Sequence, residues 1–421
     1  MNLLNKNLYL IVIAFLSAIS FTINAQDANK TPDWLLLNPD VQLEANDAIN
    51  NLYNFKFEKA DSAFKVIKNQ YPKHPLAYFL LGLSQYWRMV PDDNNRSFDN
   101  LFFQYMDSSI TFSEKLKEKE DENEEANFFL AAAYGFKGRI YEKRNEYPKA
   151  TFAAAKAYHF LNLDVKNTEL SPEFLFGVAL YNYFREWIPE AKPFMKTVMW
   201  AFSHGDEKLA LKQLNTVALN AFYTRTEAQY YLYEIYSKYA PDHAPSDSAR
   251  RANKVLALKT IKYLHETYPD NAYFHRMYAK SLYELNDNNK YGTLLEKVSK
   301  EIIAKYNNKM FGYNDYAIRY SSWYLGNYYE SHFADFENSA KFYKLHIETC
   351  EKLNETYGYY IYALDRLATL ESIKNDYDKA IECCEKIKKY ANKKNKDELE
   401  CLNKAKQNII LYKKKKAELK K

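Results

Sequence analysis

A single spacing of apolar residues recurs along most of this chain. In the stretch FEKADSAFKVIK, Ala60, Phe64 and Ile67 fall on one side of a helix and the charged residues fall on the other. The same spacing returns at Ala150, Ala154 and Ala157, at Ala210, Leu214 and Val217, at Ala257, Ile261 and Leu264, at Ala340, Lys344 and Ile347, and at Ala380, Cys384 and Ile387. A second short apolar helix, reached through a polar turn, accompanies these segments. The repetition predicts antiparallel helix pairs whose apolar faces only neighbouring pairs can cover.

The residues that break helices are too scarce for a turn-rich fold. The chain has 9 Gly and 12 Pro in 421 residues, whereas sandwiches and barrels of short strands need many more. It also has 39 Tyr, a residue whose large ring packs in a helix seam while its hydroxyl stays wet. Composition therefore favours an all-α protein.

The order of these residues resembles the tetratricopeptide repeat. In that family a large residue, a Leu-Gly pair and a Tyr mark the first helix, and Ala with a bulky residue four positions on marks the second. The clearest matching units hold Ala60 with Gly82, Gly138 with Ala150, and Ala368 with Ala380. The resemblance covers roughly residues 40–390 and implies a right-handed superhelix of seven or eight stacked pairs over 41–390. The alanine spacings are not multiples of 34 residues, so some gaps hide a further unit and others hold insertions.

The N-terminus has the pattern of an export signal. MNLLNKN carries one Lys and no acid, and the uncharged stretch LYLIVIAFLSAISFTI follows it. We expect a signal peptide over residues 1–25, cleaved near Ala25-Gln26, and a lead-in over 26–40. A retained membrane anchor is the alternative, although the stretch is slightly shorter than the ~20 residues that span a bilayer. An exported bacterial protein of the periplasm or outer membrane is the expected class.

The C-terminal segment 391–421 reads as a basic capping helix and tail. Leu399, Leu402, Ala405 and Ile409 share one face, and between residues 386 and 421 there are fourteen Lys and four acids. The outer face of a terminal helix must be exposed to solvent, which explains the lysines. Export argues against a nucleic-acid partner for this basic segment. Cys384 and Cys401 permit a disulfide outside the cytoplasm, and buried free thiols fit equally well.

An aromatic stretch interrupts the repeat at 184–205. FREWIPEAKPFMKTVMWAF begins at Phe184, and we expect Pro189 and Pro193 to break its helix. Three interpretations stay open: an insert packed on the superhelix, a partner-docking ridge, or a shallow membrane contact. The expected contact residues are Trp187, Phe194, Met199 and Trp200.

The sequence lacks the short motifs of common enzymes. It has no H-E-x-x-H, no G-x-G-x-x-G, no phosphate-binding G-x-x-x-x-G-K-[ST] and no G-x-S-x-G. We therefore expect a non-catalytic protein without a metal or cofactor.

The first helices of the pairs should line a concave groove that binds a protein or peptide partner. Aromatic side chains there would anchor the partner, and Arg139 with Lys143 would hold a carboxylate or main-chain carbonyls. For the aromatic residues, packing between helices is the competing interpretation. The alternative function is capture of a glycan or small ligand at the outer membrane, with sugars stacked on Trp and Tyr. Helical projection places these residues in the groove: Phe79, Leu83, Tyr86, Trp87, Arg139, Lys143, Phe174, Tyr181, Trp323 and Asn327.

Overall fold

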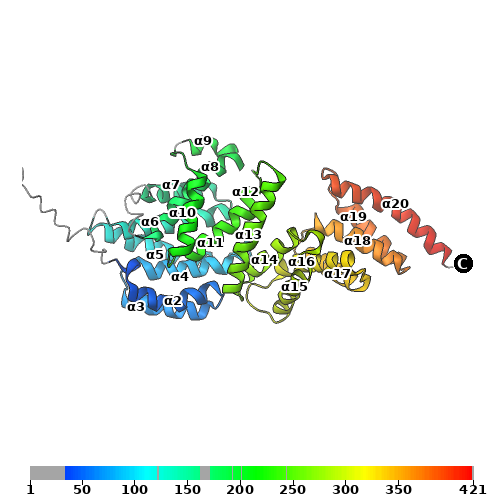
Figure 1. Ribbon diagram of the computed structural model, residues 1–421, viewed down its shortest axis with the longest axis horizontal. Helices are drawn as coiled ribbons and strands as arrows, with labels where there is room; N and C mark the ends of the chain where they lie inside the picture. Colours follow the sequence, from blue (N-terminus) through cyan, green and yellow to red (C-terminus); the bar gives the residue numbers. More distant parts are fainter. Residues whose placement is uncertain are drawn as a thin grey trace, which may run out of the picture.

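The computed structural model describes residues 34–120, 123–161, 171–191, 193–200, 202–242 and 244–419. The expected signal peptide and the first part of the lead-in lie outside these residues. Throughout the described part the chain is helical, and Figure 1 shows the helices stacked side by side along the length of the molecule.

Eight antiparallel helix pairs follow one another in the described part of the chain, and a last helix covers the final pair. The all-α, stacked-pair prediction is confirmed. The pairs are α2 (Pro39–Tyr53) with α3 (Phe57–Gln70), α4 (Pro75–Met89) with α5 (Asp99–Lys117), α6 (Glu124–Lys143) with α7 (Tyr147–Leu161), α8 (Leu175–Ala191) with α10 (Glu207–Asn220), α11 (Arg225–Glu234) with α13 (Asp247–Thr267), α14 (Ala272–Glu284) with α15 (Gly292–Asn307), α16 (Asp315–Tyr328) with α17 (Phe336–Lys352), and α18 (Tyr359–Ile373) with α19 (Tyr377–Tyr390).

Polar side chains fix where many of these helices begin. Each caps the first turn by accepting hydrogen bonds from free backbone N–H groups, which is the usual role of Asn, Asp and Ser at this position. The capping residues are Asn38, Asn123, Asp206, Ser246, Asn271, Asn314, Asp335, Asp376 and Asn395.

Two helix pairs, those that contain α5 and α15, occupy long gaps between the alanines that mark the other pairs in the sequence. In α5 the buried residues Phe102, Met106 and Ser109 have the repeating spacing, and in α15 Leu295 and Ile302 have it. Bulky residues stand in these helices where the other units have Ala. In α5 the residue at the alanine position is Phe102. Met106, four residues on, packs against Gly82, where an added Cβ would lie 2.8 Å from the Met106 Cε.

The superhelix winds tightly enough for its first pairs to touch its middle ones. Asn271 Nδ2 donates to the Tyr53 carbonyl at 2.8 Å, and the Phe55 and Phe311 rings meet edge to face at 5.9 Å. Further contacts of this kind are Asp270 N to Asn54 Oδ1 at 2.9 Å, Asn94 Nδ2 to the Tyr316 hydroxyl at 2.9 Å, Asn314 Nδ2 to the Pro91 carbonyl at 3.3 Å, and the Trp87 and Phe274 rings at 5.4 Å. Helices α2 and α4 therefore close the coil against α14 and the loops around it (Figure 1).

The aromatic stretch differs from the expectation in one respect. Helix α8 continues through Pro189 to Ala191, so Pro189 does not end the helix. Proline in the last turn removes only one backbone hydrogen bond, and the apolar face of α8 is already packed there. The short helices η4 (Pro193–Met195) and α9 (Lys196–Met199) follow, so a new helical element begins at Pro193.

The C-terminal helix α20 (Lys396–Glu418) packs on α18 and α19 and is the capping helix that the sequence predicted. Leu402, Ala405 and Ile409 are buried, whereas Leu399 is at the edge of the contact. All four cysteines, Cys350, Cys383, Cys384 and Cys401, are free thiols. In Figure 1 this end of the molecule extends away from the closed coil.

Candidate ligand-binding cavities

A cavity of about 970 Å³ lies on the concave side of the closed coil. Its walls come from α4, α6, α7, α8 and α11, and Leu36 of the lead-in lines it as well. The size is in the range of about 300–1,000 Å³ typical of small-molecule sites. Because α2 and α4 reach α14, a closed turn of the coil surrounds this space, which stays partly open to solvent.

Six of the residues that the sequence placed in a groove line this cavity together. Phe79 and Leu83 come from α4, Arg139 and Lys143 from α6, and Tyr181 from α8. Phe174 joins them from η3 (Pro172–Phe174), where its ring meets the Trp34 ring edge to face at 5.8 Å. Their role in binding a partner stays a prediction.

Tyr86 and Trp87 are core residues and do not line the cavity, so their placement in a groove is wrong. Trp87 is 0% exposed and Tyr86 is 1% exposed. The Trp87 Nε1 donates to Glu227 Oε1 at 2.6 Å, and its ring packs on Tyr53 and Tyr230. Projection of one helix could not show that the closing coil covers this turn of α4.

Trp323 and Asn327 also take part in packing. The Trp323 Nε1 donates to the Tyr283 hydroxyl at 3.1 Å, and its ring stacks on Tyr359 at 4.8 Å. Asn327 hydrogen-bonds Tyr343 on the partner helix. Neither residue lines either of the two cavities described here.

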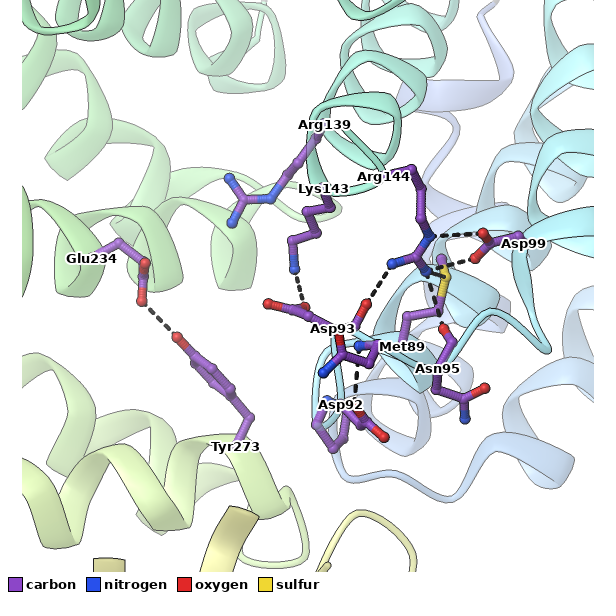
Figure 2. Close-up of polar contacts among 12 residues, drawn as sticks. Met89, Asp92, Asp93, Asn95, Asp99, Arg139, Lys143, Arg144, Glu234 and Tyr273 are labelled. Atoms are coloured by element: carbon purple, nitrogen blue, oxygen red, sulfur yellow. Dashed lines mark hydrogen bonds and ion pairs between the residues drawn. The ribbon is translucent and has the colours of Figure 1, made fainter. Parts of the chain in front are cut away.

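A polar cluster holds the loop between α4 and α5 against the end of α6 (Figure 2). Arg144 donates through Nε and Nη2 to the two oxygens of Asp99 at 2.7 Å, and Nη2 also donates to the Asn95 carbonyl. Lys143 pairs with Asp93 of the same loop. Burial lowers the pKa of Lys143, and the Asp93 charge opposes that effect. Lys143 is thus engaged within the protein, contrary to the expectation that it is available to a ligand.

Glu227 lies where the first helices meet α11. It is 3% exposed, and its Oε1 accepts from the Tyr53 hydroxyl at 3.0 Å and from Trp87. Burial raises the pKa of Glu227 to about 7, while these two hydrogen bonds and the Arg139 charge lower it. The residue joins α2, α4 and α11 and lines the cavity as well.

The aromatic stretch is mostly packed. The Trp187 ring lies on Tyr239 at 4.4 Å between ring centroids, and Met199 lines the cavity. Arg185 donates to the Phe202 carbonyl and so ties the end of the stretch to α8. Trp200 alone among the expected contact residues with described side chains is fully open to solvent, at 86% exposure. The Phe194 side chain lies outside the described part.

A second, more polar cavity of about 450 Å³ adjoins the first and shares Val90, Asp93, Arg276 and Met277 with it. Tyrosines gather on its wall, and charged groups of both signs stand between them. Arg319 lies over the Tyr320 ring at 4.3 Å and pairs with Glu355. The tyrosines are Tyr283, Tyr316, Tyr320, Tyr324 and Tyr359.

Sequence reasoning missed Glu227, Tyr230, Tyr231 and Arg276, all of which line the cavities. One signal was present: TEAQYYLYEIY places an acid inside an aromatic helix, and a buried acid needs partners. Within the described residues, no group of three His, Cys, Asp or Glu side chains is arranged to hold a metal ion. No helix in the described part has the length and apolar character needed to cross a membrane.

Comparison with known proteins finds no matching family model and no matching curated protein. Among solved structures, a circular tandem repeat protein with a novel repeat topology is 11% identical, with a TM-score of 0.25 over 90% of this chain and 98% of that one. Yeast Tom70 is 15% identical, with a TM-score of 0.25 over 90% of this chain and 91% of its own. At these values neither likeness bears on what this chain binds.

Proposed function

We propose that this chain is a non-catalytic, exported binding protein that holds a segment of a protein or peptide partner in the polar cavity of its closed coil. The observation that carries the proposal is the lining of this cavity, where tyrosines stand beside charged side chains of both signs. The polar cavity offers tyrosine hydroxyls and charges of both signs, which can satisfy the main-chain groups of an extended segment. Location in the periplasm or at the outer membrane rests on the sequence of residues 1–25.

A site-specific photo-crosslinker tests this proposal. The photoreactive residue replaces Tyr320, on the wall of the polar cavity, and in a control variant replaces Tyr263, which is 52% exposed on the outer side of α13. Irradiation in the native cell envelope should give one defined protein adduct at Tyr320 and none at Tyr263. Equal adducts at both positions, or none at Tyr320, would exclude a partner in this cavity.

Glycan or small-ligand capture is the second candidate function. Five tyrosines beside Asp92, Asp93 and Glu284 favour it, because aromatic faces stack on sugar rings and acids accept their hydroxyls. Reproducible micromolar hits on a glycan array, lost on Tyr320→Ala, would favour capture. No hits together with a protein adduct would favour the binding scaffold. Peripheral membrane contact through Trp200 is a further expectation that vesicle flotation of Trp200→Ala would test.

A further inference from the structure

Arg139 is a half-buried cation on the wall of the large cavity, and no described carboxylate forms an ion pair with it. Its Nη2 donates to the Tyr230 hydroxyl at 3.0 Å, and its guanidinium lies 5.3 Å from the Tyr231 ring centroid. Its Nε is buried and has no hydrogen-bond partner. Across the described residues, no carboxylate lies within ion-pair distance of it.

Arg144, the residue that follows the end of α6, is an arginine whose charge is paired within the protein. It has the Asp99 carboxylate and backbone carbonyls around it, as Figure 2 shows. In the same view the Arg139 guanidinium points away from that cluster. A half-buried guanidinium on a cavity wall, with an Nε that has no hydrogen-bond partner, favours an anionic ligand as its complement.

Two more polar groups near Arg139 lack partners. The Oε2 of Glu227 and the hydroxyl of Tyr86 are both buried without a hydrogen bond. Burial raises the pKa of each, and the Arg139 charge lowers both, which puts the three groups in one neighbourhood. Of these, Arg139 and Glu227 line the large cavity, and a protonated Glu227 is a hydrogen-bond donor, as is the Arg139 Nε.

Away from Arg139 the wall of the large cavity is mostly apolar, although Arg185, Glu234 and Lys238 also line it. Phe79, Phe136, Phe176 and Leu180 line it from three helices, and Met199 lines it from the aromatic stretch. A peptide main chain would bring an N–H and a C=O with every residue, and these walls offer few groups to pair them. An unbranched apolar chain brings no such groups and gains free energy from burial along the whole length.

We infer that the large cavity binds a small amphiphile of the fatty-acid class, with its carboxylate at Arg139 and its apolar chain between α4, α6 and α8. The site is separate from the polar cavity proposed for a partner segment, so either assignment can fail without the other. The C-terminal carboxylate of an apolar peptide is the other source of the same chemistry.

Calorimetric titration of the full mature chain with decanoate and with 1-decanol tests the inference. Decanoate should bind one to one, and 1-decanol about tenfold or more weaker, because it lacks the charge for Arg139. Arg139→Gln should weaken decanoate binding by about tenfold or more. The matched control is Lys137→Gln, on the same helix but paired with Asp107 outside the cavity, and it should bind as the wild type does.

Thermal unfolding of the same proteins distinguishes a loss of binding from a loss of folding. Without ligand, Arg139→Gln should melt close to the wild-type temperature, since Arg139 is half-buried and no described carboxylate forms an ion pair with it. With decanoate, only the wild type and Lys137→Gln should gain stability. Equal binding of decanoate and 1-decanol, unchanged binding by Arg139→Gln, or no binding at all would overturn the inference. Tighter binding of an apolar tripeptide with a free C-terminus than of decanoate would also overturn the assignment to a small amphiphile.

Discussion

At the scale of single residues, the cavity differs from the packed core in how its polar side chains find partners. Arg144 and Arg139 are close in sequence, yet one is satisfied by Asp99 and the other by a tyrosine hydroxyl alone. The sequence placed Arg139 in the groove but gave no sign of its missing counter-ion. That property depends on α11, which comes 90 residues later and supplies the aromatic faces around the guanidinium.

Glu227 predicts a pH dependence of stability. Its pKa is near 4.5 when unfolded and about 7 when folded, so between these values the folded state binds more protons. The free energy of unfolding should therefore fall as pH rises through this window, by up to about 3 kcal/mol. Glu227→Gln keeps an oxygen for Tyr53 and Trp87 and should remove this contribution.

The measurement is chemical denaturation of the wild type and Glu227→Gln between about pH 4 and about pH 8, which bracket the window. Half-buried His265 and buried His346, whose pKa values burial lowers to about 4, act with the opposite sign, so the informative quantity is the difference between the two proteins. Glu348→Gln, at an exposed position, is the control and should follow the wild type. A difference that does not change with pH would contradict the account of Glu227.

At the scale of helices, the repeating stripe of small and bulky residues was enough to predict paired helices. It failed where bulky residues replaced Ala, at Phe102 and Leu295, because a search for small residues passes over them. It also failed at Pro189, where the packing of α8 outweighs one lost hydrogen bond. Helix propensity describes isolated segments, whereas in these cases packing against the neighbouring helix decides which residues the helix contains.

The start of α11 depends on one acid from another pair. Glu173 accepts from the N–H groups of Phe222, Tyr223 and Thr224 at 2.6–3.0 Å, and also from the Thr224 hydroxyl. Glu173→Ala would leave several buried donors without acceptors and should lower the free energy of unfolding by about 2–4 kcal/mol. Hydrogen exchange should accelerate first in α11.

The control for this prediction is Glu337→Ala in the exposed first turn of α17, which should cost less than about 0.5 kcal/mol. If both variants had the same small effect in denaturant titration, Glu173 would not be the cap that positions α11 over the cavity.

At the scale of the whole molecule, function depends on how far the coil turns. The stacking of pairs was predictable from sequence, but most of the closing contacts join residues more than 200 positions apart, such as Tyr53 and Asn271. The closing contacts result from small rotations between successive helix pairs, added over five pairs. No local sequence pattern encodes this total rotation. For this reason the sequence predicted an open groove with Tyr86 and Trp87 on its surface, whereas both are buried by the closure.

Closure of the coil is the central claim, and zero-length carbodiimide coupling of the unmodified protein tests it most directly. The reagent joins an amine to a carboxylate already in contact, and Lys56 Nζ lies 3.8 Å from Asp270 Oδ2 across the closing contact. Mass spectrometry should find the Lys56–Asp270 link alongside the link between Lys404 and Asp365 of neighbouring helices, which are 2.7 Å apart. A strong Lys404–Asp365 link without any Lys56–Asp270 link would mean that the coil is open and would contradict the enclosed cavity.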